Sequence, residues 1–365
     1  MNSIAFISKS HVINNIGGAE MQADILARAL AEKGWDVAYV TNAISEFQFF
    51  NKYKLIPAPP VKTRFKECLS QINADIYYQR GRKDITCLVA DFCKEKKKKF
   101  VFSLANNIDC YKYKYVFRDN DSSNIQHIFH LIKNLKMDSA SLQGMYRADL
   151  VLSQTHYQKK ILKENLGIDS EVFYNVHDIP LQPQKAKKNK IPVVLWLANV
   201  KQRKQPELFL KLVEELKNVK CRFLMAGALK SKKYEKQIIN AKKCNPNFEY
   251  LGPVSIKESN SLFAQADIFV STSDNQEGFP NTLIQAWLHA VPTISLQFDP
   301  DGLIVKKNMG TVANNNYLKF KESILTLLND NTLRNELGRN AKIYSSDNFN
   351  LTKKVNTFIE LLNSV

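Results

Sequence analysis

The segment from Glu277 to Trp287 (EGFPNTLIQAW) combines an acid with an anion-binding pattern. An apolar stretch before it predicts a buried strand that ends at Ser271 to Ser273. We predict a helix from about Pro280, because proline suits a first helical turn, where its missing N–H leaves no hydrogen bond unmade. The amides around Gly278 to Thr282 would then point outward, which suits a phosphate group with the Glu277 carboxylate beside it.

A second candidate is the basic loop within the segment from Pro192 to Leu216. A predicted strand, Val193 to Leu197, runs into Lys201, Arg203 and Lys204, and an amphipathic helix follows. Basic side chains at this point could reach a diphosphate. The alternative is an ordinary solvated basic turn.

The third candidate is the glycine pair Gly17 and Gly18, between a short apolar strand and an amphipathic helix. Glycine lacks a Cβ, so backbone there can approach a ligand closely, and the helix start again offers amides. The spacing is not GxGxxG, which disfavours a dinucleotide cofactor. A plain strand-to-helix turn is the alternative.

The Glu277 segment resembles the glutamate-x7-glutamate signature of family 4 retaining glycosyltransferases (glycosyl transferases group 1), which use nucleotide-sugars. The chain departs from this signature at the second position, eight residues on, which holds Gln285. The resemblance implies that Glu277 contacts the hydroxyls of the donor sugar and that the second position contacts the ribose. A glutamine amide can also hydrogen-bond a ribose diol.

The same resemblance implies roles for the other two segments. The glycine pair would face the donor phosphates and the acceptor, and Lys204 matches the lysine that stabilises the leaving diphosphate. The matching arginine position holds Asn199, so Lys201 or Arg203 would supply the second positive charge. The implied catalytic residues are Glu277 and Lys204, and the implied donor-binding residues are Gly17, Gly18, Lys201, Arg203, Val254, Gly278, Phe279, Pro280, Asn281, Thr282 and Gln285.

The resemblance implies transfer of a sugar, with retention, from a nucleoside diphosphate donor to a hydroxyl of a glycan or polyprenyl-linked acceptor. Such enzymes serve bacterial surface polysaccharide synthesis, including capsule and lipopolysaccharide. We expect no cofactor and no metal, because positive side chains and helix amides can stabilise the leaving diphosphate. Two alternatives are a nucleotide-sugar epimerase of the same fold and a non-catalytic nucleotide- or glycan-binding protein.

Strands and helices alternate twice along the chain, which predicts an α/β protein with parallel sheets. The resemblance specifies the GT-B fold, two Rossmann-like domains whose sheets face across a cleft. We predict domains at 1–180 and 190–345, joined by a proline- and lysine-rich linker, with a helix at 346–365 packing back on the first. The first-half strands are expected near Ile4–Ser8, Asp36–Thr41, Asp75–Gln79, Phe100–Leu104, Leu150–Ser153 and Glu171–Tyr174.

Composition is that of an ordinary globular protein, with 365 residues of which 44% are hydrophobic and 24% charged. No apolar run reaches the ~20 residues that span a bilayer, and the first residues lack a signal peptide's apolar core, so we expect a cytoplasmic protein. The six cysteines form no CxxC pair, which predicts neither a zinc site nor a disulfide framework.

The net charge of +17 includes lysine clusters at Lys94–Lys99, Lys185–Lys190 and Lys230–Lys233. These clusters could attract an anionic membrane surface, such as the inner face of the plasma membrane, or simply form a solvated surface. Nucleic-acid binding is disfavoured, because no nucleic-acid-binding motif is present.

Other polar residues receive structural interpretations. His127 and His130 lie one helical turn apart but lack the remaining ligands of a zinc pattern. We interpret Asp109 as a residue that caps a turn rather than a polar group of the cleft. Asp299 and Asp301 form a DxD pattern, which we interpret as a turn closed by the following glycine rather than a metal site.

Overall fold

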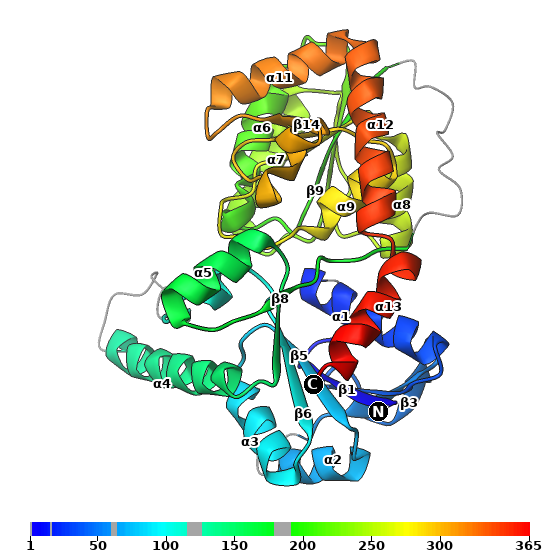
Figure 1. The fold of residues 1–365 in the computed structure, drawn as a ribbon. Coiled ribbons are helices and arrows are strands. Elements are labelled where there is room, and N and C mark those ends of the chain that lie inside the picture. Colours follow the sequence, from blue (N-terminus) through cyan, green and yellow to red (C-terminus); the bar gives the residue numbers. More distant parts are fainter. Residues whose placement is uncertain (1, 15–16, 60–63, 115–125, 179–190) are drawn as a thin grey trace. The chain divides into compact units, whose positions relative to one another are not determined.

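The computed structural model describes residues 2–14, 17–59, 64–114, 126–178 and 191–365 (Figure 1), and for 126–130 it describes the backbone alone. The chain forms two compact units, one of residues 1–176 with 351–365 and one of residues 177–350. We call them the first and second unit. The sequence predicted a boundary at 180–190 and a returning segment from 346, whereas the chain changes unit at 176–177 and 350–351.

The first unit contains an eight-stranded sheet in the order β3-β4-β2-β1-β5-β6-β7-β8. All neighbouring strands are parallel except the hairpin pair β3 and β4. Its strands are β1 (Ser3–Ile7), β2 (Asp36–Thr41), β3 (Gln48–Phe50), β4 (Tyr53–Pro57), β5 (Ile76–Arg80), β6 (Lys99–Ser103), β7 (Leu150–Ser153) and β8 (Glu171–Val172). Its helices are α1 (Gly18–Glu32), α2 (Phe65–Ile72), α3 (Thr86–Lys96), α4 (Gln126–Tyr146), α5 (His156–Leu166) and α13 (Leu351–Asn363), with a 3-10 turn η2 (Asn107–Cys110).

Nearly continuous burial marks the central strands of the first unit, as expected where helices cover both faces of a parallel sheet. On one face, Tyr77, Phe100 and Phe102 join the core beneath α3. Helix α13 also belongs to this unit, since the Phe358 ring lies 5.0 Å from that of Phe173. Leu351, Val355, Phe358 and Leu362 form its buried stripe.

The second unit contains a six-stranded parallel sheet in the order β11-β10-β9-β12-β13-β14. Its strands are β9 (Val193–Leu197), β10 (Arg222–Ala226), β11 (Phe248–Tyr250), β12 (Ile268–Ser271), β13 (Thr293–Ser295) and β14 (Gly310–Val312). Its helices are α6 (Pro206–Glu215), α7 (Glu235–Cys244), α8 (Ile256–Gln265), α9 (Asn281–Leu288), α10 (Leu303–Lys306), α11 (Tyr317–Asn329) and α12 (Asn331–Asn348). Short 3-10 turns, η3 (Gln202–Lys204), η4 (Lys232–Tyr234) and η5 (Pro300–Gly302), fill the loops.

One glycine shapes the edge of this second sheet where the strands end. Gly227 follows β10 with a φ of +137°, and a Cβ there would lie 1.8 Å from the carbonyl oxygen of Ala198. Only glycine accepts both that backbone angle and that approach. The loops after β9 and β10 therefore lie against each other at this edge.

The prediction of an α/β chain with two parallel sheets is confirmed. Strands occur at all six predicted places in the first unit, within one or two residues at most ends. The hairpin strands β3 and β4 were not predicted. Within the described residues, no helix is both long and apolar enough to cross a membrane.

Candidate active site

The two segments with predicted chemistry in the second unit follow neighbouring parallel strands, β9 and β12. From β9 the chain runs outward to β10 and β11, and it then returns to the other side of β9 to form β12. This reversal is the topological switch point at which open α/β sheets bind ligands beyond the strand ends. The basic loop and the EGFPN loop therefore meet where a ligand site is expected.

Lys204 and Glu277 form an ion pair between these two loops. The Lys204 Nζ lies 3.0 Å from the Glu277 Oε2, and the two side chains are 13% and 16% exposed. Lys204 ends the 3-10 turn η3, and Glu277 lies in the loop before α9. The two residues that the sequence predicted to be catalytic are thus in direct contact.

The Glu277 carboxylate is held in its charged form. Burial by itself raises its pKa, but the positive charges of Lys204, Arg203 and Lys201 and the hydrogen bond from Lys204 outweigh burial, so the pKa lies below its ordinary value. Glu277 is therefore a hydrogen-bond acceptor at neutral pH and not a proton donor.

A buried threonine fixes the position of Lys204. The Trp196 indole N–H donates to the Thr272 Oγ1 over 2.9 Å, and the Thr272 hydroxyl donates to the Lys204 carbonyl over 2.6 Å. A backbone bond of 3.0 Å from Asp274 N–H to the Arg203 carbonyl joins the loops a second time. The sequence did not single out Thr272 or Trp196, although a polar residue directly after a buried strand was a usable signal.

Arg203 lies beside the ion pair. Its Nε is 3.7 Å from the Asp274 Oδ1, and its Nε and Nη2 are buried without a hydrogen-bond partner among the described residues. Lys201 is exposed. Of the two residues predicted to supply the second positive charge, Arg203 is the one that the fold encloses.

The loop before α9 is anchored in the core. Helix α9 begins at Asn281, so Pro280 is the cap residue, one position outside the first turn where it was predicted. The Phe279 ring packs against Trp287 and Phe349, with centroids 6.0 and 5.1 Å away. Since this ring is used in packing, the predicted donor contact at Phe279 would come from its backbone. Gly278 and Asn281 are buried and Thr282 is half-buried.

Gln285 is 4% exposed and contacts α8. Its Nε2 donates to the Ser259 Oγ over 3.1 Å, and its carbonyl oxygen lies 2.8 Å from the His289 Nδ1. The contact of Gln285 with a ribose remains a prediction, and the side-chain amide oxygen would make that contact. Val254 lies half-buried in the loop that leads into α8.

In the first unit, Gly17 caps α1 with extended backbone and Gly18 begins the helix, while residues 15–16 lie outside the described part. The contact of this pair with phosphates remains a prediction. The two sets of candidate residues, around Gly17 and around Glu277, belong to different units.

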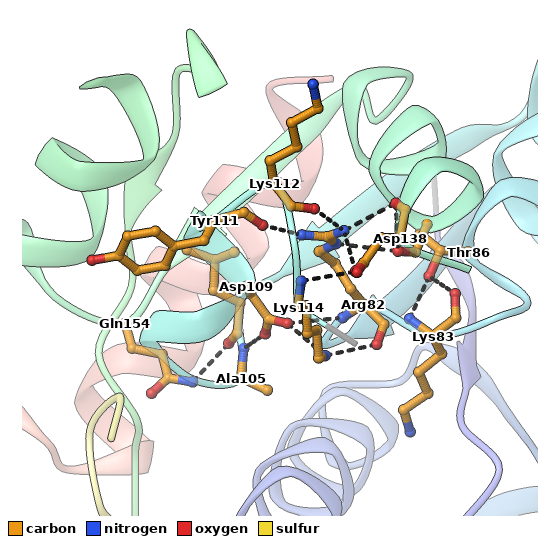
Figure 2. Close-up of polar contacts among 12 residues, drawn as sticks. Arg82, Lys83, Thr86, Ala105, Asp109, Tyr111, Lys112, Lys114, Asp138 and Gln154 are labelled. Carbon is orange, nitrogen blue, oxygen red and sulfur yellow. Dashed lines mark hydrogen bonds and ion pairs between the residues drawn. The ribbon is translucent and has the colours of Figure 1, made fainter. Parts of the chain in front are cut away.

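Asp109 is fully buried in a polar cluster of the first unit (Figure 2). Its carboxylate accepts from the Ala105 N–H over 2.8 Å and from the Lys114 Nζ over 2.7 Å. Burial raises its pKa, but Lys114 and these hydrogen bonds hold the pKa below its ordinary value. The interpretation of Asp109 as a turn-capping residue is confirmed.

The remaining candidates for metal binding are the acidic pair Asp299 and Asp301 and the histidines His127 and His130. Asp299 accepts from the backbone N–H groups of Ile304 and Val305 over 2.8 and 3.3 Å, which confirms its turn role. Within the part of the chain that the structure describes, no three His, Cys, Asp or Glu side chains gather as a metal site. The side chains of His127 and His130 and the cluster Lys185–Lys190 lie outside that part.

Residues 178–344, which span the second unit almost completely, match the family model described as Glycosyl transferases group 1. This part of the chain belongs to that family. The resemblance inferred from the EGFPN segment is therefore confirmed. No curated protein matches the sequence of the chain.

Solved structures are similar in fold to the whole chain and not only to the part that the family model matches. Sucrose-phosphate synthase from Thermosynechococcus elongatus is similar with a TM-score of 0.78 at 15% identity, covering 100% of this chain and 99% of that one. Anabaena HepE in complex with UDP-glucose is similar with a TM-score of 0.77 at 15% identity, covering 100% of both chains. WaaG, a glycosyltransferase involved in lipopolysaccharide biosynthesis, is similar with a TM-score of 0.72 at 16% identity, over 98% of this chain and 99% of that one. The chain has the GT-B fold.

Proposed function

We propose that this glycosyltransferase moves a sugar from a nucleoside diphosphate to a hydroxyl of a glycan or lipid-linked acceptor, with retention at the anomeric carbon. The observation that carries the proposal is the Lys204–Glu277 ion pair at the switch point of the second sheet. A carboxylate for sugar hydroxyls and a cation for a diphosphate are in contact there.

In the proposed reaction, the Glu277 carboxylate accepts hydrogen bonds from donor sugar hydroxyls and orients the sugar. The Lys204 ammonium and the first amides of α9 stabilise the negative charge that grows on the diphosphate as its bond to the sugar breaks. Arg203 adds the second positive charge. The acceptor oxygen bonds to the anomeric carbon on the face that the diphosphate leaves, and the acceptor proton passes to a phosphate oxygen. Retention follows without a protein nucleophile.

We propose that donor binding needs no metal ion or other cofactor. Three basic side chains, Lys201, Arg203 and Lys204, lie on one loop and all act on the charge of Glu277. Cations positioned in this way supply the charge that a divalent ion would otherwise bring to a diphosphate.

The donor class we propose is a UDP-sugar, because HepE, which shares this fold, was solved with UDP-glucose and with UDP. The proposed role is bacterial surface polysaccharide synthesis, supported by the similarity to WaaG. We propose the cytoplasm as its location, with the inner face of the plasma membrane as a contact surface. The lysines of 94–97 and 230–233 support this proposal, because they are exposed and clusters of exposed lysines attract anionic lipid in general.

A panel of nucleotide-sugars tests the proposal. A donor at 100 times its dissociation constant should stabilise the folded chain by about 2.7 kcal/mol, which a thermal shift detects. Each donor that binds is then incubated with and without candidate acceptors. A new sugar isomer formed without acceptor would identify an epimerase instead, and binding with neither transfer nor donor hydrolysis would identify a non-catalytic protein.

A further inference from the structure

Four basic residues lie in or beside the loop after β5 of the first unit: Arg80, Arg82, Lys83 and Lys114. Two of them form ion pairs with aspartates (Figure 2). The Arg82 Nη2 lies 3.2 Å from the Asp138 Oδ1, and the Lys114 Nζ lies 2.7 Å from the Asp109 Oδ1. The other two, Arg80 and Lys83, have no carboxylate at ion-pair distance among the described residues. The ion pairs of Arg82 and Lys114 account for those two charges within the fold. The charges of Arg80 and Lys83 need another explanation.

Arg80 ends β5 and is 6% exposed. Among the described residues its guanidinium donates only to neutral oxygens, which are the Asn175 Oδ1, the Ser103 Oγ at 3.4 Å and the Tyr78 hydroxyl at 3.5 Å. Its Nε is buried and has no hydrogen-bond partner among the described residues. A buried charge without a counter-ion is destabilising, so folds retain one chiefly where an anion will meet it.

Lys83 is a second cation with no ion-pair partner in the part of the chain that the structure describes. Its Nζ donates to the Ser8 Oγ over 3.0 Å, and Figure 2 shows its side chain directed away from the Asp109–Asp138 cluster. Burial lowers the pKa of Lys83, and the opposing charges of Glu20 and Asp109 do not offset this effect. The neighbouring Lys9 differs, because its Nζ lies 2.7 Å from the Asp84 Oδ1.

Ser8 connects the two cations. It accepts from Lys83, and it lines a small pocket together with Arg80, Ala19, Tyr39 and Tyr78. The pocket has room for about one water molecule, which is also the size of one phosphate oxygen. A phosphate group at its mouth could insert one oxygen towards Arg80 and present another to Lys83.

We infer that Arg80, Lys83 and Ser8 form a phosphate subsite in the first unit, and that its ligand is a phosphate group of the acceptor. This inference rests on the proposed function, in which the donor diphosphate is bound by Lys204 and Arg203 of the second unit. The acceptor class is then a phosphate-bearing one, either a lipid-linked glycan with its diphosphate or a sugar phosphate. Both kinds of acceptor carry a phosphate group that this subsite could bind.

The test measures the thermal shift that inorganic phosphate causes in the full chain while UDP is saturating. UDP occupies the proposed donor site, so a remaining phosphate shift reports a second site. The wild-type chain should be stabilised by phosphate, and Lys83→Met and Arg80→Gln should each weaken phosphate binding at least tenfold. Lys9→Met is the matched control and should bind phosphate within twofold of the wild type.

Three results would overturn the inference: no phosphate shift in the wild type under saturating UDP, displacement of phosphate by UDP, or equal phosphate binding in wild type and Lys83→Met. If Arg80→Gln does not fold, the Lys83→Met comparison decides alone. The UDP shift of the wild type, measured without phosphate, tests the proposed function separately. The two acceptor sources are then distinguished by replacing inorganic phosphate with a sugar 1-phosphate or with vesicles containing polyprenyl diphosphate. The acceptor source is the ligand whose binding is weakened in Lys83→Met.

Discussion

The Lys204 ammonium and the Glu277 carboxylate are 3.0 Å apart, on loops that follow two neighbouring strands of the second sheet. In this ion pair Lys204 helps to hold the pKa of Glu277 below its ordinary value, so the carboxylate is charged. A donor that enters the site would meet a carboxylate ready to accept from its hydroxyls and an ammonium that can be shared with its diphosphate. Because these charged groups are already in position before the ligand binds, they need not move during the reaction.

Replacing the lysine should act on turnover more than on donor affinity. Lys204→Ala should raise the barrier by roughly 2 to 4 kcal/mol, because the ammonium is aimed at charge that develops in the transition state. Steady-state kinetics with the donor found in the panel measure this effect. Lys220→Ala, which removes an exposed lysine before β10 at the opposite edge of the same sheet, is the control and should keep the wild-type rate. An unchanged rate in Lys204→Ala would remove Lys204 from the site.

The same variant should change the pH profile. Lys204 is the main group that lowers the pKa of Glu277 against the opposing effect of burial, so its removal raises that pKa. The ionised carboxylate is the active form, so activity is lost as pH falls through this pKa. The acid limb of the residual rate should therefore move to higher pH in Lys204→Ala, and an unmoved limb would show that Glu277 ionisation does not control the rate.

Chelation should leave donor binding intact. The diphosphate charge is met by basic side chains and helix amides in this account, so EDTA should not change the thermal shift caused by the donor. Complete loss of that shift in EDTA, with recovery on adding manganese, would contradict the account and direct attention to Asp299 and Asp301.

The Thr272 hydroxyl should be needed to position Lys204. Thr272→Val keeps the shape but leaves the Trp196 N–H and the Lys204 carbonyl without this partner, at about 1–3 kcal/mol for each buried group. We expect lower stability and a lower kcat with little change in KM, and Thr272→Ser should restore both. Equal kcat in the valine and serine variants would limit Thr272 to a structural role.

Much of the second unit could be predicted because the signals there are local. A strand, a glycine-proline loop and a helix follow one another within the Glu277 segment, and the structure begins α9 at Asn281, one residue after the predicted start. The hairpin of β3 and β4 was missed, because its turn uses Asn51 and Lys52 at positive φ where glycine would have been the signal.

Contacts between distant segments could not be predicted in the same way. The sequence does not show that the Gln285 amide nitrogen donates to Ser259, because this contact depends on α8 packing beside α9. The ion pair that the Asp109 Oδ1 forms with the Lys114 Nζ, 2.7 Å away, was likewise not predicted. Both outcomes depend on how helices and loops pack, which the sequence pattern does not specify.

Gln285 should affect every ligand that carries a ribose. Gln285→Ala should weaken UDP and the intact donor by similar factors, since the ribose is common to both. Gln285→Glu, which restores the residue usual in the family, should bind both at least as well as the wild type. Calorimetry measures the two affinities, and full affinity in Gln285→Ala would place the ribose elsewhere.

The central claim is that Glu277 acts on the donor sugar, and calorimetry on Glu277→Gln tests it most directly. The variant keeps the shape of the side chain but removes the charge, which is worth ~1.5 kcal/mol or more in a charge-assisted hydrogen bond, or about tenfold. We predict that Glu277→Gln binds UDP with nearly unchanged affinity, while the intact donor loses its sugar-dependent affinity and transfer falls at least about tenfold. Equal losses for UDP and for the intact donor, in a variant that remains folded, would contradict the role assigned to Glu277.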